Sequence, residues 1–279
     1  MINMKLLLIY NPFSGKGKNK KVNELIKLLE NKFEITEFVS NGIGSITDYL
    51  KNDNNIYDII TICGGDGTIN EAISSISEFN YSPKIAVVPL GTMNDFSHYL
   101  GMSKNIKKTV NYIINMKTIS HDIYKANDKI FVYGFALGML TNISYKKFKF
   151  KKIFGRLSYY LVAIKEIFKA KKIKLEADID NKKIDMKSNL VLISSTNRIA
   201  GYKIKKGNDL VVAIFKGGRF LLPFKLYWYL ITGHTKYKYD VNNLVINTDG
   251  SSFNTDGEYN KEVNKIKIEK YKTFDFITK

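Results

Sequence analysis

The chain has 279 residues, of which 44% are apolar and 25% charged, a composition typical of one large or two ordinary globular domains. No run of about 18 uncharged apolar residues occurs, which argues against a transmembrane helix. The single cysteine, Cys63, excludes a disulfide framework and a cysteine-based zinc site. The N-terminal apolar run has no small-residue cleavage site and predicts a strand, so we expect a cytoplasmic protein.

The net charge of +18 is unevenly distributed along the chain. Residues 122–279 carry 31 basic and 15 acidic side chains, whereas residues 1–121 carry 13 and 11. The presence of only three arginines indicates a lysine bias that explains part of the total but not the asymmetry. Such a basic second half attracts polyanions, either nucleic acid or an anionic membrane surface.

The first part of the chain alternates short apolar runs with helical patterns. The predicted strands are 5–10, 34–39, 57–63 and 84–89, and the predicted helices are 22–33, 45–52 and 69–77. This alternation predicts a parallel sheet covered by helices.

After residue 121 the pattern changes to closely spaced strands separated by turn pairs such as Asp180-Asn181, Asp249-Gly250 and Asp256-Gly257. The expected strands are 129–138, 174–180, 182–187, 189–195, 209–215, 243–248, 265–271 and 274–278, with one helix over 155–170. This spacing is typical of an antiparallel sandwich or barrel. We therefore expect two domains, 1–121 and 122–279.

Three glycine-containing loops follow predicted strands: NPFSGKG at 11–17, GGDGT at 64–68 and PLGTMND at 89–95. Glycines allow close approach to a phosphate, and the carboxyl edge of a parallel sheet is where ligands bind. We expect a Cβ at Gly65 to intrude on such a phosphate. The alternative is a set of tight structural turns. Neither GxxxxGK[ST] nor GxGxxG occurs, which argues against a P-loop NTPase or a Rossmann dinucleotide site.

The segments NPFSG (11–15), GGDGTIN (64–70), PLGTMNDF (89–96) and DGE (256–258) occur in an order that resembles the diacylglycerol kinase catalytic-domain family. This family includes bacterial lipid kinases and sphingosine kinases. GGDGT alone is shared with NAD kinases and phosphofructokinases, whereas the PLGTxNDF block is more specific. Residues 151–164 are also similar to the family. The resemblance implies an NAD-kinase-like α/β domain, a mainly antiparallel β-sandwich domain and an active site in the cleft.

The resemblance also implies functional residues and cofactors, namely ATP and Mg²⁺. Nucleotide-contacting positions fall on Asn11, Pro12, Phe13, Ser14, Gly15, Ser40, Gly64, Gly65, Asp66, Gly67, Thr68, Ile69, Asn70 and Thr92. Ser40 stands where a threonine is usual. Asp256 and Glu258 fall on the catalytic base region, and either is a candidate base; the alternative for this segment is a surface hairpin turn. Asp66 would organise a Mg²⁺–phosphate network or stabilise its own loop.

One segment departs from the family pattern. In AGYKIKKGNDLVVAIF (200–215), Lys205 and Lys206 stand where acidic residues of a structural Mg²⁺ site are usual. Asp209 is a candidate shifted metal ligand, and a lysine ammonium replacing the ion is the alternative. This departure does not affect the Mg²⁺ that accompanies ATP.

Two segments combine cations with aromatic residues: KKFKFKK at 146–152 and GGRFLLPFKLYWYLITG at 217–233. Such mixtures suit a membrane interface. The alternatives are a protected strand edge for the first and a buried segment for the second. We expect peripheral association with a lipid substrate at an anionic membrane surface, with a homodimer as an option. No nucleic-acid-binding motif is present, so no nucleic acid is expected.

These observations favour an ATP-dependent lipid kinase that phosphorylates a lipid hydroxyl, with diacylglycerol as the expected substrate and phosphatidic acid as the product. The alternatives are an NAD-kinase-like or other small-molecule kinase, and a nucleotide-binding regulator without turnover.

Overall fold

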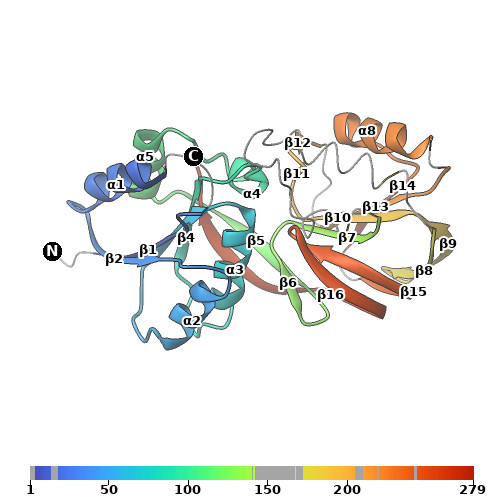
Figure 1. The fold of residues 1–279 in the computed structure, drawn as a ribbon, viewed down its shortest axis with the longest axis horizontal. Coiled ribbons are helices and arrows are strands. Elements are labelled where there is room, and N and C mark those ends of the chain that lie inside the picture. Colours follow the sequence, from blue (N-terminus) through green and yellow to red (C-terminus); the bar gives the residue numbers. More distant parts are fainter. Residues whose placement is uncertain are drawn as a thin grey trace. The chain divides into compact units, whose positions relative to one another are not determined.

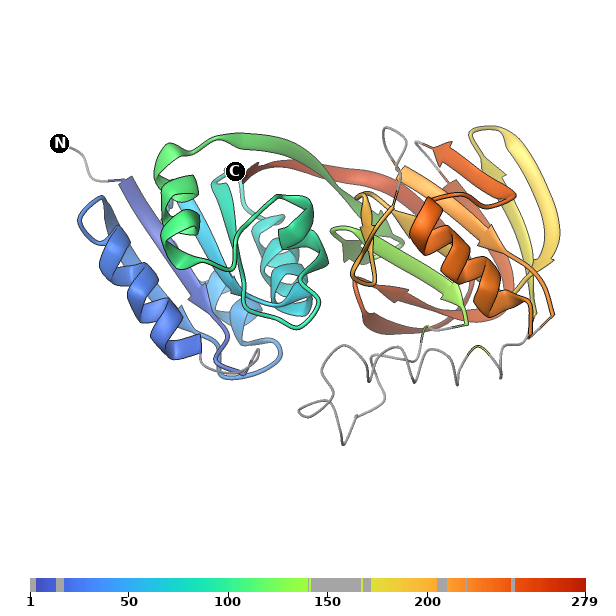
Figure 2. The same ribbon diagram turned by 90° about the horizontal axis from the view of Figure 1, so that it is seen from above.

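The computed structural model describes residues 4–13, 18–139, 141, 167, 172–204, 210–218, 220–241 and 244–279. The chain divides into two compact units (Figures 1 and 2). The first comprises Met1–Asp122 and Lys272–Lys279, and the second comprises Ile123–Tyr271. The last eight residues, which the sequence analysis grouped with the second domain, thus return to the first unit. The segment 146–152 and nearly all of the predicted helix 155–170 lie outside the described residues.

The first unit is built on four parallel strands in the order β4-β3-β1-β2. They are β1 (Met4–Tyr10), β2 (Phe33–Val39), β3 (Ile59–Gly64) and β4 (Lys84–Pro89). β3 is buried along its whole length, as expected for a central strand covered on both faces. The predicted α/β fold of this part is confirmed.

Helices cover both faces of this sheet: α1 and α5 lie on one face, and α2 and α3 on the other (Figure 1). The helices are α1 (Lys18–Leu29), α2 (Ser45–Asn52), α3 (Asp66–Ile76), α4 (Asp95–Tyr99) and α5 (Ile106–Asn115). α3 begins at Asp66, before the predicted start at Ile69. In the GGDGT segment, Gly64 therefore ends β3, Gly65 caps α3, and Asp66–Thr68 form the first turn of α3.

The C-terminal strand β16 (Glu258–Ile277) is continuous, although the sequence predicted separate strands over 265–271 and 274–278. Its last residues belong to the first unit, where Phe276 pairs in parallel with Ile85 of β4. Phe276 is fully buried, and its ring meets the ring of Phe96 edge-on at 4.9 Å between centroids. The end of the chain thus completes the core of the first unit.

The second unit consists mainly of antiparallel strands, which confirms the predicted class. In chain order they are β5 (Thr118–Ala126), which enters from the first unit, β6 (Lys129–Phe131), β7 (Gly134–Gly138), β8 (Ile173–Ile179), β9 (Lys182–Ser188), β10 (Leu190–Ser194), β11 (Arg198–Ile199), β12 (Tyr202–Lys203), β13 (Leu210–Phe215), β14 (Tyr237–Val241) and β15 (Leu244–Thr255). The path β14-β13-β10-β7-β15-β16 links five of them to β16, β8 pairs with β15 and β9, and β5 pairs with β16 and β6.

Strand β15 changes partner along its length. Leu244–Thr248 pair with β8, whereas Phe253–Thr255 pair with β7. Register irregularities toward β16 lie between these two stretches, where Gly250 has φ +85°. The Asp249-Gly250 pair, predicted as a turn between strands, is therefore a bulge inside one strand. The alternating apolar residues of these strands share one hydrophobic core.

The helix α8 (Leu222–Thr232) packs on β13 in the second unit (Figure 2). Its inner face buries Leu222, Leu226 and Tyr229, and the Tyr229 ring meets Phe215 edge-on at 5.3 Å. Gly233 ends the helix with φ 70°. No helix among the described residues is long and apolar enough to span a membrane.

We predict that Phe276→Ala destabilises the protein by about 3–5 kcal/mol, because it leaves a cavity in the core of the first unit. Val39→Ala is the matched control in the same unit, because Val39 is exposed and its truncation changes stability by only about 0.5 kcal/mol. Thermal or urea unfolding measures both. Equal stabilities of the two variants would show that the C-terminal strand contributes nothing to this core.

Candidate functional site

The loops that follow the four parallel strands of the first unit lie at one edge of the sheet, because parallel strands end on the same side. Backbone hydrogen bonds tie each loop to a neighbour: Asn11 N donates to Cys63 O at 3.1 Å, Ser40 N to Tyr10 O at 2.8 Å, and Leu90 N to Gly64 O at 2.9 Å. The structure thus brings together the first-unit segments that the sequence singled out.

Gly64 is required by the packing of Thr68. A Cβ at Gly64 would lie 2.5 Å from the Cβ of Thr68, which is closer than real atoms approach. The Thr68 hydroxyl oxygen accepts a hydrogen bond from the Asn11 side-chain amide at 3.0 Å. Asn11 in turn accepts the Phe13 N–H at 2.9 Å, which shapes the loop after β1. Because Gly64 has no side chain, Thr68 of α3 can pack against it and bind Asn11 in the loop after β1.

Gly65 faces the backbone of Gly91 and not an open space. A Cβ at Gly91 would lie 2.5 Å from the Gly65 Cα, and one at Gly65 would lie 3.2 Å from the Gly91 Cα. The structure thus gives Gly65 a packing role against Gly91, and the expectation that a Cβ at Gly65 would intrude on a phosphate stays a prediction. The two glycines are needed because two backbones pass each other here.

Asn94 binds the backbone of Gly91 through its side chain. The sequence analysis did not include Asn94 among the candidate site residues. Its side-chain oxygen accepts the Gly91 N–H at 2.7 Å, and its amide group donates to the Gly91 carbonyl at 2.8 Å. Asn94 is fully buried and has φ 55°, a left-handed conformation that asparagine tolerates well. The signal that could have found it was its place in the PLGTMNDF block at residues 89–96.

Asp66 connects the GGDGT segment to α4. Its carboxylate accepts the Phe96 N–H at 3.3 Å and also bonds the backbone N–H groups of Asp95 and Asn94, at the N-terminus of that helix. Burial raises the pKa of the Asp66 carboxyl above its usual value, and these N–H bonds oppose the shift. The groups that hold Asp66 thus come from the loop after β4.

Gly67 is the one residue of GGDGT that these contacts do not explain. It is exposed, and a Cβ placed on it would have no atom within 4 Å apart from its own neighbouring backbone. It lies in the first turn of α3, where the backbone N–H groups have no carbonyl partner within the helix. A helix N-terminus with an open approach is suited to bind an anion.

The remaining first-unit candidates differ in accessibility. Ile69 and Asn70 are buried, so they support the site from within. The buried Ser40 hydroxyl lies 2.8 Å from the Ser45 hydroxyl. The residues that are at least partly accessible are Pro12, Phe13 and Thr92. Ser14 and Gly15 lie outside the described residues.

Asp256 is buried in the turn between β15 and β16, with 5% of its surface exposed. Its carboxylate accepts the backbone N–H groups of Val132, Tyr133 and Gly134, the last two at 3.0 and 2.8 Å. Its own N–H donates to the Gly134 carbonyl at 2.7 Å. Asp256 thus fixes the connection between β6 and β7 to this turn. The segment is a hairpin turn in which Asp256 is buried, whereas Gly257 and Glu258 are exposed.

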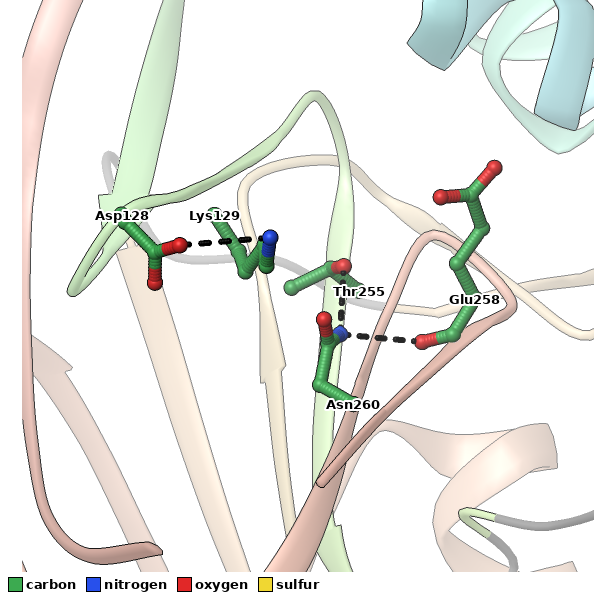
Figure 3. A network of polar contacts seen from close by, with 5 residues as sticks. All are labelled: Asp128, Lys129, Thr255, Glu258 and Asn260. Carbon is green, nitrogen blue, oxygen red and sulfur yellow. Dashed lines mark hydrogen bonds and ion pairs between the residues drawn. The ribbon is translucent and has the colours of Figure 1, made fainter. Parts of the chain in front are cut away.

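Glu258 follows in the same turn and is exposed. The Asn260 side-chain amide donates to the Thr255 hydroxyl at 3.1 Å and to the Glu258 carbonyl at 3.2 Å, which stiffens the turn. In Figure 3 the Glu258 carboxylate points away from Thr255 and Asn260. The turn therefore presents one buried carboxylate and one exposed carboxylate.

The candidate structural metal site at Asp209, with Lys205 and Lys206, lies outside the described residues. Among the residues that are described, no group of three His, Cys, Asp or Glu side chains is arranged to hold a metal ion.

Comparison with known proteins gives the family. Residues 5–126 match the model of the diacylglycerol kinase catalytic domain. Proteins named diacylglycerol kinase from Staphylococcus haemolyticus and Staphylococcus epidermidis are 35% and 34% identical over 203 and 200 residues. Each alignment covers 70% of this chain, but the chain covers only 61% and 63% of the respective relatives.

A crystal structure of a diacylglycerol kinase from Bacillus anthracis gives a TM-score of 0.80 at 22% identity, covering 100% of this chain and 98% of the other. This likeness gives the fold class of both units: a helix-covered parallel sheet followed by mainly antiparallel strands. By its sequence the domain at residues 5–126 belongs to the diacylglycerol kinase catalytic-domain family. The resemblance indicated by the motifs is confirmed.

We predict opposite effects on stability for two glycine substitutions in these loops. Gly91→Ala places a methyl group against the Gly65 backbone and lowers the free energy of unfolding by about 1–3 kcal/mol. Gly67→Ala adds the same methyl group in open space within a helix, and leaves stability unchanged or raises it by up to about 1 kcal/mol. Urea unfolding of the two variants measures the difference. Similar losses in both would contradict the assigned roles.

Proposed function

We propose that the chain is an ATP-dependent lipid kinase that transfers the γ-phosphoryl group of ATP to the hydroxyl of diacylglycerol, giving phosphatidic acid. The observation that carries the proposal is the first turn of α3, where Gly67 is exposed beside the tightly packed Gly64, Gly65 and Gly91. The family match at residues 5–126 supports the same reaction.

The first-unit loops fit a nucleotide phosphate. The first turn of α3 offers backbone N–H groups, and Gly67 leaves room for the ligand. Asn11 and Thr68 fix the loop after β1 beside this turn. Bound ATP supplies the phosphoryl group, and the Mg²⁺ that accompanies it neutralises phosphate charge. Mg²⁺ at such sites is held largely by phosphates and water with one or two carboxylates, and Asp66 is the carboxylate nearest in sequence to Gly67.

We assign the general base to Glu258 and a positioning role to Asp256. A base must reach the hydroxyl of the substrate, and Glu258 is exposed whereas Asp256 is buried. The Asp256 carboxylate already accepts three backbone N–H groups, so it serves to hold the turn that presents Glu258. Glu258 accepts the proton of the lipid hydroxyl as the oxygen attacks phosphorus.

The direct test is a phosphorylation assay with purified protein, γ-labelled ATP and Mg²⁺. Diacylglycerol, monoacylglycerol, a sphingoid base and NAD are offered separately. Label in phosphatidic acid is the expected result. Label in NADP instead would favour the small-molecule kinase, and no label in any acceptor would favour a nucleotide-binding regulator.

We predict that Gly67→Glu separates nucleotide binding from folding. A carboxylate in the first turn of a helix is compatible with the helix dipole, so unfolding stability stays within about 0.5 kcal/mol. The same charge repels phosphates, and the dissociation constant for ATP rises by roughly tenfold or more. Titration calorimetry with Gly67→Ala as the uncharged control measures this. Parental ATP affinity in Gly67→Glu would exclude the first turn of α3 as the phosphate site.

We predict that two isosteric substitutions in the Asp-Gly-Glu turn have different consequences. Glu258→Gln lowers turnover by about 10²–10⁴-fold, with unchanged stability and an ATP affinity within a few-fold of the parent. Asp256→Asn lowers the free energy of unfolding by about 1–3 kcal/mol, because an amide cannot accept all three backbone N–H groups. Steady-state kinetics and urea unfolding measure the two. Near-parental turnover in Glu258→Gln would place the base elsewhere.

A further inference from the structure

The outer side of α8 exposes a row of large apolar side chains. Among the described residues, exposed large hydrophobic side chains are concentrated between 220 and 231: Phe220, Leu221, Phe224, Tyr227, Trp228 and Ile231. Phe224 is 73% exposed, Trp228 62% and Ile231 53%. Soluble surfaces rarely gather so many apolar side chains in one place, so this face has a function.

The spacing shows that α8 has two separate apolar faces. Phe224, Trp228 and Ile231 follow the i, i+4, i+7 rule and share the outer face. The inner face already packs into the core beneath, where Leu222 and Leu226 join a cluster with Phe215. In Figure 1 α8 is the outermost described element on its side of the second unit. The outer face is therefore not needed for the fold.

The charged side chains of the segment that contains α8 are all basic, although Asp240 of β14 lies close enough to act on Tyr229. Residues 210–239 contain five basic residues, Lys216, Arg219, Lys225, Lys236 and Lys238, and no acidic residue. The Lys225 ammonium donates to the Lys216 carbonyl at 2.8 Å, and the Lys216 and Lys236 ammonium groups lie 4.9 and 5.5 Å from the centroid of the Tyr237 ring. Cations thus flank the apolar face at both ends of the helix.

We propose that α8 docks the protein on an anionic lipid bilayer, lying along the surface with Phe224, Trp228 and Ile231 at the boundary between headgroups and acyl chains. Aromatic rings prefer this depth, and flanking lysines attract anionic headgroups. A second copy is the poorer occupant, because symmetric pairing of α8 on α8 would bring together the basic residues that flank the two helices.

The inference goes beyond phosphoryl transfer and is tested without ATP. Trp228 is the only tryptophan in the chain, so the parent protein carries its own probe at the centre of the proposed face. We expect vesicles with equal molar amounts of phosphatidylglycerol and phosphatidylcholine to shift the Trp228 emission to the blue. Lipids that carry bromine on the part of the acyl chain nearest the headgroup should quench this emission. Vesicles of phosphatidylcholine alone give a much weaker response. Binding of the protein to vesicles with unchanged Trp228 emission would overturn the proposal, as would no binding at all.

Matched variants test the face itself. Ile231→Ser lowers the vesicle partition coefficient roughly fivefold to tenfold. Ile56→Ser removes the same side chain from a similarly exposed position in the first unit, and its partitioning stays within about twofold of the parent. Lys225→Gln lowers binding to anionic vesicles by roughly fivefold and weakens its salt dependence.

Three outcomes would overturn the proposal: equal losses for Ile231→Ser and Ile56→Ser, no loss in either, or an Ile231→Ser variant that dissociates a dimer while vesicle binding persists. The last would show that a second copy covers the face. Vesicle binding without lipid phosphorylation would refute the proposed kinase activity and leave the docking face intact.

Discussion

The close approach of the Gly65 and Gly91 backbones is the constraint on which the rest of the first unit's candidate site depends. Their Cα atoms leave no room for a side chain, so the loops after β3 and β4 are in direct backbone contact. Asn94 fixes Gly91 by two hydrogen bonds, and Asp66 binds the N-terminus of α4 across the same junction. These contacts hold the first turn of α3 against the loop after β4, and Gly67 is the exposed position of that turn.

The two units share one structural feature. In each, a motif aspartate accepts backbone N–H groups from a neighbouring segment: Asp66 from the start of α4, and Asp256 from the connection between β6 and β7. In each, the exposed position lies one or two residues further on, at Gly67 or Glu258. The aspartates are anchors, and the exposed neighbours are the positions that a ligand can reach. A buried acceptor with several N–H partners is costly to replace, so such anchors keep the loops in place.

Much of this follows from the sequence. All four parallel strands were predicted to within about two residues. Three of them are apolar runs, because strands buried on both faces need uninterrupted apolar side chains, whereas the edge strand β2 alternates apolar and polar residues and is largely accessible. The Asp180-Asn181 turn is also as predicted, with positive φ at both residues as a two-residue hairpin requires. The motifs GGDGT and PLGTMNDF were sufficient to indicate the family.

What the sequence did not show depends on contacts between distant segments. Nothing local indicates that Gly65 faces Gly91, because these residues are brought together only by the pairing of β3 and β4. The bulge at Gly250 has the same Asp-Gly pattern as a true turn, and only the change of partner along β15 distinguishes them. Nor does helical spacing reveal which of the two apolar faces of α8 is buried, since that depends on the strand beneath it.

Backbone amide hydrogen exchange of the first-unit loops tests the central claim most directly. The claim is that phosphates bind at the first turn of α3 and that the junction couples this turn to the loop after β4. Saturating Mg·ATP is predicted to slow exchange at residues 66–68 and, with it, at residues 91–96, whereas adenosine, which has no phosphates, leaves both unchanged. Unchanged exchange at residues 66–68 under saturating ATP, or equal protection by adenosine, would contradict it.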